Sequence, residues 1–457
     1  MKRETCKVLI IGAGPGGYVC AIRAAQLGLE TVVIEARAAG GTCLNVGCIP
    51  SKALIHAANE FHAARHLAGE NPYGITTSAP AIDLGRTTDW KDGIVARLTG
   101  GVAGLLRKAK VRVIEGQARI LDGKTVEVET AEGAVRLRTE HLVIATGSRP
   151  QALSALPFGG DILSSTEALS LRQVPGRLAI VGGGYIGLEI GTAMAKLGAQ
   201  VTIIEAGPRI LPQYDADLTK PVAARLTALG VTVLTGARAE AFAGGVLSVT
   251  TAEGSREVAA DKVLVTAGRV PVVSGFGLEE LHLDRRGPFI AVDAQCRTSM
   301  RGVWAIGDVT GDPMLAHRAM AQGDLVAEAI AGKKVSWDKR AMPAVCFTDP
   351  EIVTLGAMPG TVPGAEVAVF PFAGNGRSLT LERGDGFVRV ICEPSTGLVL
   401  GLQAVGAGVS ELAGEFALAL EMAATLTDLA ATIHAHPTLG ETVQEAALKG
   451  LGRALHI

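Results

Sequence analysis

Two cysteines five residues apart are the side chains of this sequence best suited to chemistry. Cys43 and Cys48 stand in residues 40–52, with Gly47 before the second cysteine and Pro50 after it. A thiolate can attack a disulfide, bind a metal or exchange electrons with a redox cofactor. On a regular α-helix the two side chains would lie on different faces, so a disulfide requires a distorted turn, which Gly47 and Pro50 permit.

Two other interpretations of the pair stay open on residue types alone. A structural zinc site needs a second Cys or His pair at ligand spacing, and neither Cys20 nor His56 supplies one. The two thiols could also be inert members of a core. The other cysteines are singly spaced, and we interpret them as buried, unreactive thiols: Cys6, Cys20, Cys296, Cys346 and Cys392.

His62 and His66 are the other candidate metal ligands. They share a helix face at i and i+4, but no third ligand is visible. We therefore expect no metal site in this chain.

The cysteine pair follows a pattern that the sequence contains twice. An apolar strand (8–11) leads into a glycine turn (12–17), a helix that ends near Leu27, and a second strand (31–34) that ends in Glu35. The second copy has a strand at 178–181, a turn at 182–187, a helix to Leu197, and a strand at 201–204 that ends in Glu205. From first glycine to glutamate both copies span 23 residues (35 − 12 and 205 − 182).

Each copy has the context of a dinucleotide-binding fingerprint. Its glycines let the backbone approach a pyrophosphate, the helix N-terminus donates N–H groups, and the carboxylate accepts from ribose hydroxyls. Two sites imply two cofactors, or a cofactor and a nucleotide substrate. Glu205 repels a ribose 2′-phosphate, so the second site should prefer NAD, whereas Arg209 keeps some use of NADP open.

The rest of the chain completes two such units and adds a third part. Residues 55–110 alternate helical and loop patterns, and 111–145 are expected to form short strands. The apolar run at 142–147 is echoed at 263–268, which again indicates duplication. Strands at 366–371, 386–392 and 398–405 and helices from Ser410 indicate a last α+β domain without a nucleotide fingerprint.

The expected fold class is therefore α/β, with two Rossmann-like dinucleotide-binding domains and a C-terminal α+β domain for dimerisation. We divide the chain into residues 1–148 (first nucleotide domain with the cysteine pair), 149–272 (second nucleotide domain), 273–344 (return to the first) and 345–457.

Composition excludes several classes of function. The 457 residues carry 43 basic and 45 acidic side chains, a net charge of -2, without a Lys/Arg-rich run, so we expect no nucleic-acid partner. The first apolar run breaks at Gly12 after four residues, which fits neither a signal peptide nor a membrane span. An odd number of scattered cysteines, seven, is unlike a secreted disulfide framework and indicates the cytoplasm.

Over its whole length the sequence resembles the pyridine-nucleotide disulfide oxidoreductases, whose redox motif matches residues 40–52. The resemblance implies that Cys43 is the interchange thiol, that Cys48 contacts the flavin, and that Lys52 lies near flavin N5, paired with Glu189. A second flavin motif is matched at 304–308, with Asp308 on the ribityl chain, followed by 314–317 along the isoalloxazine.

The expected cofactors are FAD and NAD. For FAD the expected contacts are Gly12, Gly14, Gly17, Glu35, Gly41, Thr42, Lys52, Gly116, Thr146, Gly147, Asp308, Met314, Leu315, Ala316 and His317. For NAD they are Gly182, Gly184, Tyr185, Ile186, Gly187, Glu189, Glu205 and Gly268.

The C-terminal segment resembles the family's terminal motif, with His436 as the acid/base and Glu441 fixing its tautomer; we interpret His434 as structural. In the family this histidine reaches the cysteine pair of the other subunit, which implies an obligate homodimer with composite sites.

The implied reaction is the oxidation of protein-bound dihydrolipoamide by NAD. The implied partner is the lipoylated acyltransferase core of a 2-oxo acid dehydrogenase complex, and a lipoylated partner of glycine cleavage stays open as an alternative. Residues 49–56, 90–95, 314–323 and 441–457 are most similar to enzymes that serve branched-chain complexes.

Two alternatives are an NADPH-dependent reductase of glutathione or mercuric type and a flavoprotein subunit without catalysis. Glu205 and a C-terminus without vicinal cysteines argue against the first, and the retention of Cys43, Cys48, His436 and Glu441 argues against the second.

Overall fold

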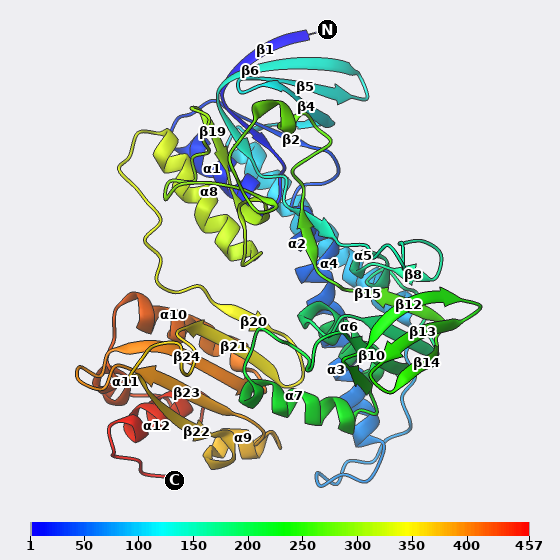
Figure 1. Cartoon of the computed structure of the whole chain (residues 1–457). Coiled ribbons are helices and arrows are strands. Elements are labelled where there is room, and N and C mark those ends of the chain that lie inside the picture. Colours follow the sequence, from blue (N-terminus) through cyan, green and yellow to red (C-terminus); the bar gives the residue numbers. More distant parts are fainter. Residues whose placement is uncertain (1, 457) are drawn as a thin grey trace.

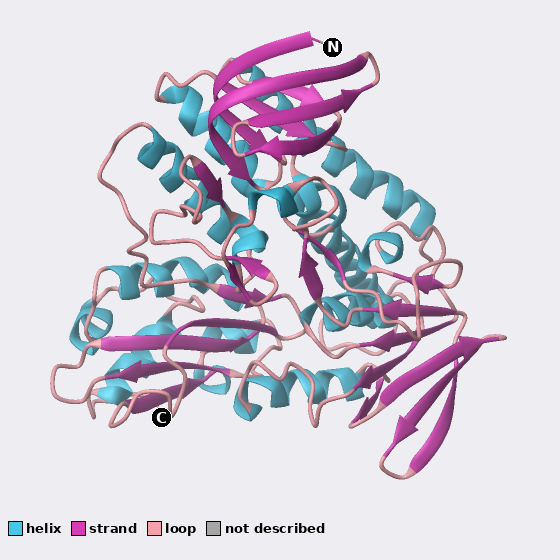
Figure 2. Ribbon diagram, turned by 45° about the horizontal axis from the view of Figure 1, so that its top comes forward, coloured by secondary structure: helices cyan, strands magenta, loops and turns pink. Residues whose placement is uncertain are grey.

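Three large sheets organise the chain, which the computed structural model describes from residue 2 to residue 456 (Figure 1). One belongs to the first nucleotide unit, one to the second, and one to the C-terminal part. Figure 2 shows the strands of these sheets with helices packed around them.

The first sheet has the strand order β3-β2-β1-β6-β5-β4, and β19 also pairs with β6. Its strands are β1 (Lys2–Ile11), β2 (Thr31–Glu35), β3 (Arg112–Glu115), β4 (Gln117–Asp122), β5 (Thr125–Thr130), β6 (Gly133–Ile144) and β19 (Val303–Ala305). β1 is longer than the expected strand at 8–11 because its polar first half pairs with β6, Lys2 opposite Val135 and Cys6 opposite Thr139. The apolar pattern alone could not indicate that extension.

The second unit repeats the parallel arrangement with the order β11-β10-β9-β15-β8. Its elements are β8 (Ile162–Leu163), α5 (Ser165–Ala168), β9 (Arg177–Val181), α6 (Tyr185–Lys196), β10 (Gln200–Glu205), α7 (Ala216–Ala228), β11 (Thr232–Thr235) and β15 (Lys262–Val265). Three antiparallel strands extend from it: β12 (Arg238–Ala243), β13 (Val246–Thr251) and β14 (Gly254–Ala259). The antiparallel pair β7 (Ser148–Pro150) and β16 (Arg269–Pro271) lies where the chain passes between the two units.

The helices of the first unit carry the cysteine motif. They are α1 (Pro15–Gln26), α2 (Gly41–Val46), α3 (Cys48–Leu67), α4 (Leu84–Lys108) and α8 (Ala316–Ile330). Of these, α1, α4 and α8 pack on the first sheet, whereas α3 packs against α6 of the second unit. α1 and α8 lie side by side (Figure 1). Their backbones approach closely because glycines face each other: a Cβ on Gly323 would lie 2.4 Å from Gly16 O.

The C-terminal part is an antiparallel sheet of order β20-β21-β24-β23-β22 with helices packed on it. Its elements are β20 (Ala344–Cys346), β21 (Glu351–Gly356), β22 (Glu366–Pro371), α9 (Gly376–Thr380), β23 (Phe387–Cys392), β24 (Val399–Gly406), α10 (Ala413–Glu421), α11 (Leu426–Ala431) and α12 (Glu441–Gly450). Short elements complete the chain: η1 (Leu278–Leu281), β17 (Arg285–Arg286), β18 (Phe289–Ile290), η2 (Gly307–Thr310), η3 (Phe372–Gly374) and η4 (Val409–Leu412).

The architecture confirms the expected α/β fold class with two Rossmann-like units and a C-terminal α+β part. The division at residues 148, 272 and 344 stays a prediction; β20 begins at Ala344, one residue before the expected start of the last domain. No helix between residues 2 and 456 has both the length and the apolar character that a membrane crossing requires.

Gly323→Ala should destabilise the first unit, because the added Cβ would push α8 away from α1. We expect the free energy of unfolding to fall by about 1–3 kcal/mol, the usual cost of overpacking. Denaturant unfolding of the FAD-loaded protein measures the change. Gly100→Ala, on the exposed face of α4, is the control. The Cβ added there meets no atom within 4 Å, so the free energy of unfolding should stay the same or rise slightly. Equal effects of the two substitutions would contradict the packing argument.

Candidate active site

The cysteine pair lies at a break between two helices. Cys43 belongs to α2 and Cys48 is the first residue of α3, and Gly47 between them has φ -134° and ψ -109°, outside helical geometry. A Cβ on Gly47 would lie 2.9 Å from Thr42 O. The break turns the two thiols toward each other, and their side chains are hydrogen-bonded. The distorted turn expected at Gly47 is therefore present.

The two thiols differ in acidity because they share one hydrogen bond and one nearby cation. The hydrogen bond from Cys43, helped by the positive charge of Lys52 and opposed by burial, lowers the pKa of Cys48 to about 7. The same hydrogen bond, together with burial, raises the pKa of Cys43. A single thiolate on Cys48 is the favoured charge state of the reduced pair.

The other five cysteines lie in a different environment. Burial raises the pKa of each of them, to about 11 for Cys6 and to about 12 for Cys296 and Cys346. Burial acts in the same direction on the pKa of Cys20 and Cys392. Low thiolate content keeps such cysteines unreactive.

Lys52 is held by the carboxylate of Glu189, as the resemblance implies. Lys52 Nζ lies 2.7 Å from Glu189 Oε2 and 4.4 Å from the centre of the Phe347 ring. The other carboxylate oxygen, Oε1, accepts from Phe347 N at 2.9 Å. Glu189 is only 3% exposed, so both of its oxygens are engaged by these partners. The sequence did not indicate the contribution of Phe347.

The two glycine turns have matching hydrogen bonds. Glu35 accepts from Ala13 N at 2.7 Å, and Glu205 accepts from Gly183 N at the same distance. Gly12 and Gly182 both have positive φ, +102° and +112°. A Cβ on Gly17 or Gly187 would collide with the carbonyl oxygen of the first glycine of its own turn. These positions therefore require glycine, and the repeated unit keeps its geometry in both copies.

Both turns fit a dinucleotide. Gly14 and Gly184 precede α1 and α6 with extended backbones, and no side chain caps either helix. A Cβ on Gly184 would meet no atom within 4 Å, and one on Gly14 only Gly41 Cα at 3.8 Å. Uncapped N–H groups beside open space are the donor set that a pyrophosphate requires.

Asp308, expected at the ribityl chain of FAD, is held by residues that the sequence analysis did not single out. Ser148 Oγ donates to Asp308 Oδ2, and Arg269 donates to both Ser148 Oγ and Ser148 O at 2.8 Å. Ser148 and Arg269 directly follow Gly147 and Gly268, so the echo between 142–147 and 263–268 was a signal that could have found them.

The remaining expected contacts lie around the two turns and the start of α8. Gly41 is in left-handed backbone against Gly14, and Thr42 is exposed beside it. Gly116 N donates to Glu35 O at 3.0 Å, Thr146 Oγ1 to Val272 O at 2.6 Å, and Val272 N to Gly147 O at 2.9 Å.

Met314 and Leu315 are half-buried before α8, Ala316 begins it, and His317 Nε2 bonds Pro343 O at 2.8 Å. Tyr185 and Ile186 begin α6, and Gly268 O accepts from Gln151 N at 3.0 Å.

His436 is presented to solvent by a well-ordered turn before α12. Its side chain is 79% exposed, and Nδ1 lies 2.9 Å from Glu441 Oε1. Burial would raise the pKa of Glu441, but hydrogen bonds from Thr438 N and His436 outweigh it and leave that pKa below its usual value. An ionised carboxylate only accepts, so Nδ1 carries the proton and Nε2 is left to act on another group.

His434 has the structural environment that we expected. It is 8% exposed, and its ring nitrogens bond Glu415 Oε1 at 2.8 Å and Thr432 O at 3.0 Å. The hydrogen bond to Glu415 raises the pKa of His434. Both ring nitrogens are occupied, so this histidine has no site left for catalysis.

One chain does not bring His436 and the cysteine pair together. The segment between α11 and α12, which carries His436, lies at the lower left of Figure 1, away from α2 near the middle of the view. His62 bonds Arg225 at 3.3 Å, and no group of three potential metal ligands occurs among residues 2–456.

Comparisons with known families cover nearly the whole chain. Residues 6–323 match the model of the pyridine nucleotide-disulphide oxidoreductases, and residues 342–447 match the dimerisation domain of the same family.

Individual relatives match over their full length. The chain is 58% identical over 456 residues to a dihydrolipoyl dehydrogenase of Pseudomonas aeruginosa, with 98% of each chain covered. It is 44% identical to that of Geobacillus stearothermophilus over 99% of this chain and 97% of the other. Among solved structures, LpdA from Mycobacterium tuberculosis has a TM-score of 0.88 at 29% identity, covering 98% of this chain and 99% of that one. The HOCl-induced flavoprotein disulfide reductase RclA from Escherichia coli has a TM-score of 0.85 at 25% identity, with 96% and 98% covered.

In the reduced protein we expect the Cys48 thiolate to titrate with a pKa of about 7. Lys52→Met should raise that pKa, because it removes the cation that favours the thiolate. Ultraviolet difference spectra between the protein and its Cys48→Ser variant, recorded against pH, isolate this thiol. Lys220→Met, on the exposed face of α7, is the matched control and should leave the titration unchanged. An equal pKa in the Lys52→Met protein would contradict the assignment.

Proposed function

The chain belongs to the pyridine nucleotide-disulphide oxidoreductase family, and from that premise we propose that it oxidises protein-bound dihydrolipoamide to lipoamide and reduces NAD to NADH. The single observation that carries the proposal is the hydrogen-bonded pair of Cys43 and Cys48 beside Lys52, in a chain 58% identical to a dihydrolipoyl dehydrogenase. Its cofactors are FAD and NAD, as in the family.

We assign FAD to the first glycine turn and NAD to the second. Glu35 and Glu205 end the strands that adjoin these turns, where each carboxylate can accept from ribose hydroxyls. Asp308, held by Ser148, is placed to bind the ribityl chain. When bound, FAD supplies two-electron exchange between the thiol pair and the nicotinamide.

The thiol chemistry is a disulfide exchange. A substrate thiolate attacks Cys43 Sγ of the oxidised pair, the bond to Cys48 breaks, and Cys48 leaves as a thiolate. The second substrate sulfur, after losing its proton, attacks the first, closes the lipoyl ring and releases Cys43. The dithiol is oxidised and the pair is reduced. The low pKa of Cys48 makes it the better leaving group.

The proton of the substrate dithiol needs a base that one chain does not supply at the pair. The dimerisation domain supports assembly as a homodimer. We propose that His436 of the partner subunit is this base and that Glu441 fixes its tautomer, so that each site is composite. Their contact within one chain, together with the exposure of His436, supports the proposal.

The proposed lipoyl carrier is the acyltransferase core of a 2-oxo acid dehydrogenase complex, of the branched-chain type. Similarity of four segments, residues 49–56, 90–95, 314–323 and 441–457, supports that choice of complex. A cytoplasmic location is also proposed, on the five buried cysteines that form no disulfide framework.

Anaerobic addition of dihydrolipoamide to the FAD-loaded protein should reduce it and produce a long-wavelength absorbance band. NAD should then discharge the band with formation of NADH, and NADP should do so far less, because Glu205 repels the 2′-phosphate. Cys48→Ser should abolish the band but keep FAD bound. Reduction by NADPH with no response to dihydrolipoamide would replace the proposal by the reductase alternative.

His436→Gln should slow dihydrolipoamide oxidation by about 100-fold or more, the usual contribution of a general base. The free thiol must then ionise without help, so the remaining rate should rise with pH. His434→Gln is the control for an effect on stability alone, because it removes a buried histidine from the same segment. We expect His434→Gln to lower the melting temperature but to have little effect on the rate of dihydrolipoamide oxidation. An unchanged rate of dihydrolipoamide oxidation in His436→Gln would contradict the role of this base.

A further inference from the structure

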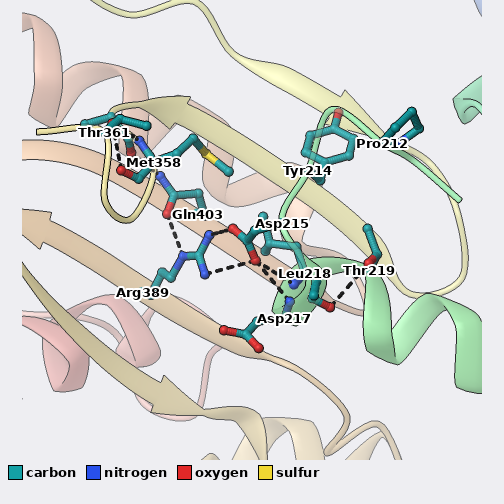
Figure 3. A network of polar contacts seen from close by, with 12 residues as sticks. Pro212, Tyr214, Asp215, Asp217, Leu218, Thr219, Met358, Thr361, Arg389 and Gln403 are labelled. Carbon is teal, nitrogen blue, oxygen red and sulfur yellow. Dashed lines mark hydrogen bonds and ion pairs between the residues drawn. The ribbon is translucent and has the colours of Figure 1, made fainter. Parts of the chain in front are cut away.

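A buried ion pair joins the second nucleotide unit to the C-terminal sheet (Figure 3). Arg389 on β23 is 2% exposed, and its guanidinium donates to both carboxylate oxygens of Asp215. Arg389 Nε also donates to Gln403 Oε1 at 2.7 Å, and Gln403 Nε2 donates to Ala357 O at 2.7 Å. The guanidinium is thus held in place by acceptors on one strand, β24, and at the start of one helix, α7.

Asp215 is the N-cap of α7, so the ion pair fixes where that helix begins. Its Oδ1 accepts from Asp217 N at 3.1 Å and from Leu218 N at 3.2 Å. Burial would raise the pKa of Asp215, but the hydrogen bonds from Arg389 and Leu218 outweigh it and keep the carboxyl ionised.

The segment between Glu205 and Asp215 lies against the second glycine turn. Leu211 N donates to Gly183 O at 2.9 Å, and Tyr214 N donates to Leu211 O at 3.0 Å. Leu211 and Tyr214 are buried in the hydrophobic core that the second unit shares with the C-terminal part. The position of this segment over the turn therefore depends on the C-terminal part as well as on its own unit.

The guanidinium of Arg209 points toward the C-terminal end of this segment. Its guanidinium donates to Pro212 O at 3.1 Å and to Tyr214 O, immediately before Asp215. The carboxylate of Glu205, four residues earlier, is held instead by Gly183 N and Gly207 N. A guanidinium beside the ribose favours a 2′-phosphate, whereas a carboxylate disfavours it. The orientation of Arg209 is therefore a determinant of nucleotide choice.

We propose that Arg389 is a positioning residue for nucleotide specificity: by holding Asp215, it keeps the carbonyls of Pro212 and Tyr214 where they restrain Arg209 away from the ribose. The inference rests on the proposed function in one respect, that Glu205 marks the ribose of the nicotinamide nucleotide. Without the ion pair, the end of the segment moves, Arg209 is released, and NADPH gains a cation for its 2′-phosphate.

A second ion pair, at the C-terminal end of α7, provides a matched control. Arg225 Nε lies 3.0 Å from Asp349 Oδ2, and Asp349 also pairs with Lys196 and Arg383. This contact joins the same helix to the same C-terminal part but does not touch the segment that carries Arg209. Loss of Arg225 therefore tests the effect of weaker docking alone.

The test compares the anaerobic reduction of the FAD-loaded protein by NADH and by NADPH, measured by stopped flow. In Arg389→Met the ratio of the NADPH to the NADH second-order rate constant should rise about tenfold, the effect of one charged hydrogen bond. In Arg225→Met the ratio should stay constant even if the melting temperature falls. In the double variant Arg389→Met/Arg209→Ala the rise should disappear.

Asp215→Asn gives an independent version of the same test if Arg389→Met does not accumulate. Asparagine still caps α7 but loses the charge that Arg389 binds, so the ratio should rise in the same direction. An unchanged ratio in whichever variant folds, or a rise that persists without Arg209, overturns the inference.

The measurement is separate from the lipoamide reaction, because it follows only the nucleotide and the flavin. Failure of dihydrolipoamide to reduce the protein would refute the proposed function and leave this result intact. Glu205→Ala tests the shared premise: it should itself shift the ratio toward NADPH. No shift in that variant overturns the inference.

Discussion

One buried carboxylate, that of Glu189, holds the parts of the active site in register. It lies on α6 directly after the second glycine turn, binds Lys52 from the helix that begins at Cys48, and accepts from the backbone of Phe347 at the entry to the C-terminal part. A charge so deeply buried is stable only when it is paired and hydrogen-bonded. The contact that joins the parts also positions Lys52, whose charge favours the Cys48 thiolate. Assembly of the fold and activation of the thiol therefore depend on the same ion pair.

The sequence best predicts features whose contacts join residues close to each other in the sequence, or whose pattern occurs twice. The glutamates at 35 and 205 bond backbone N–H groups 22 residues away in both copies, and three strands of the C-terminal sheet, β22, β23 and β24, were placed to within one residue. Contacts between distant segments leave no such pattern. Ser148 and Asp308 are 160 residues apart, Phe347 and Glu189 158, and Arg389 and Asp215 174. A residue such as Arg389 is ordinary in sequence, and only the packing of the C-terminal sheet against α7 gives it a role.

The C-terminal part has two tasks that impose different constraints on its surface. On one side it is fixed to the second nucleotide unit by Asp349 and Arg389, which are both buried and paired with opposite charges. Elsewhere it exposes large apolar side chains, Leu418, Met422 and Ile433, the last of them three residues before His436. Apolar surface of this kind marks an interface, and a dimerisation domain supplies the second copy that covers it. In the proposed composite site, the attachment on the first side would let the partner present His436 at a defined place.

The two reactive groups depend on their surroundings in opposite ways. The Cys48 thiolate is stabilised entirely within one chain, by Cys43 and Lys52, so its acidity is set when the chain folds. Among residues 2–456, the His436 ring bonds only Glu441, and its side chain is 79% exposed. A base in water is neither positioned nor shielded, so the proposed catalytic role of His436 requires the partner surface around it. In the proposed composite site, folding of one chain thus prepares the Cys48 thiolate as leaving group and assembly of two chains completes the base, so activity should depend on dimerisation.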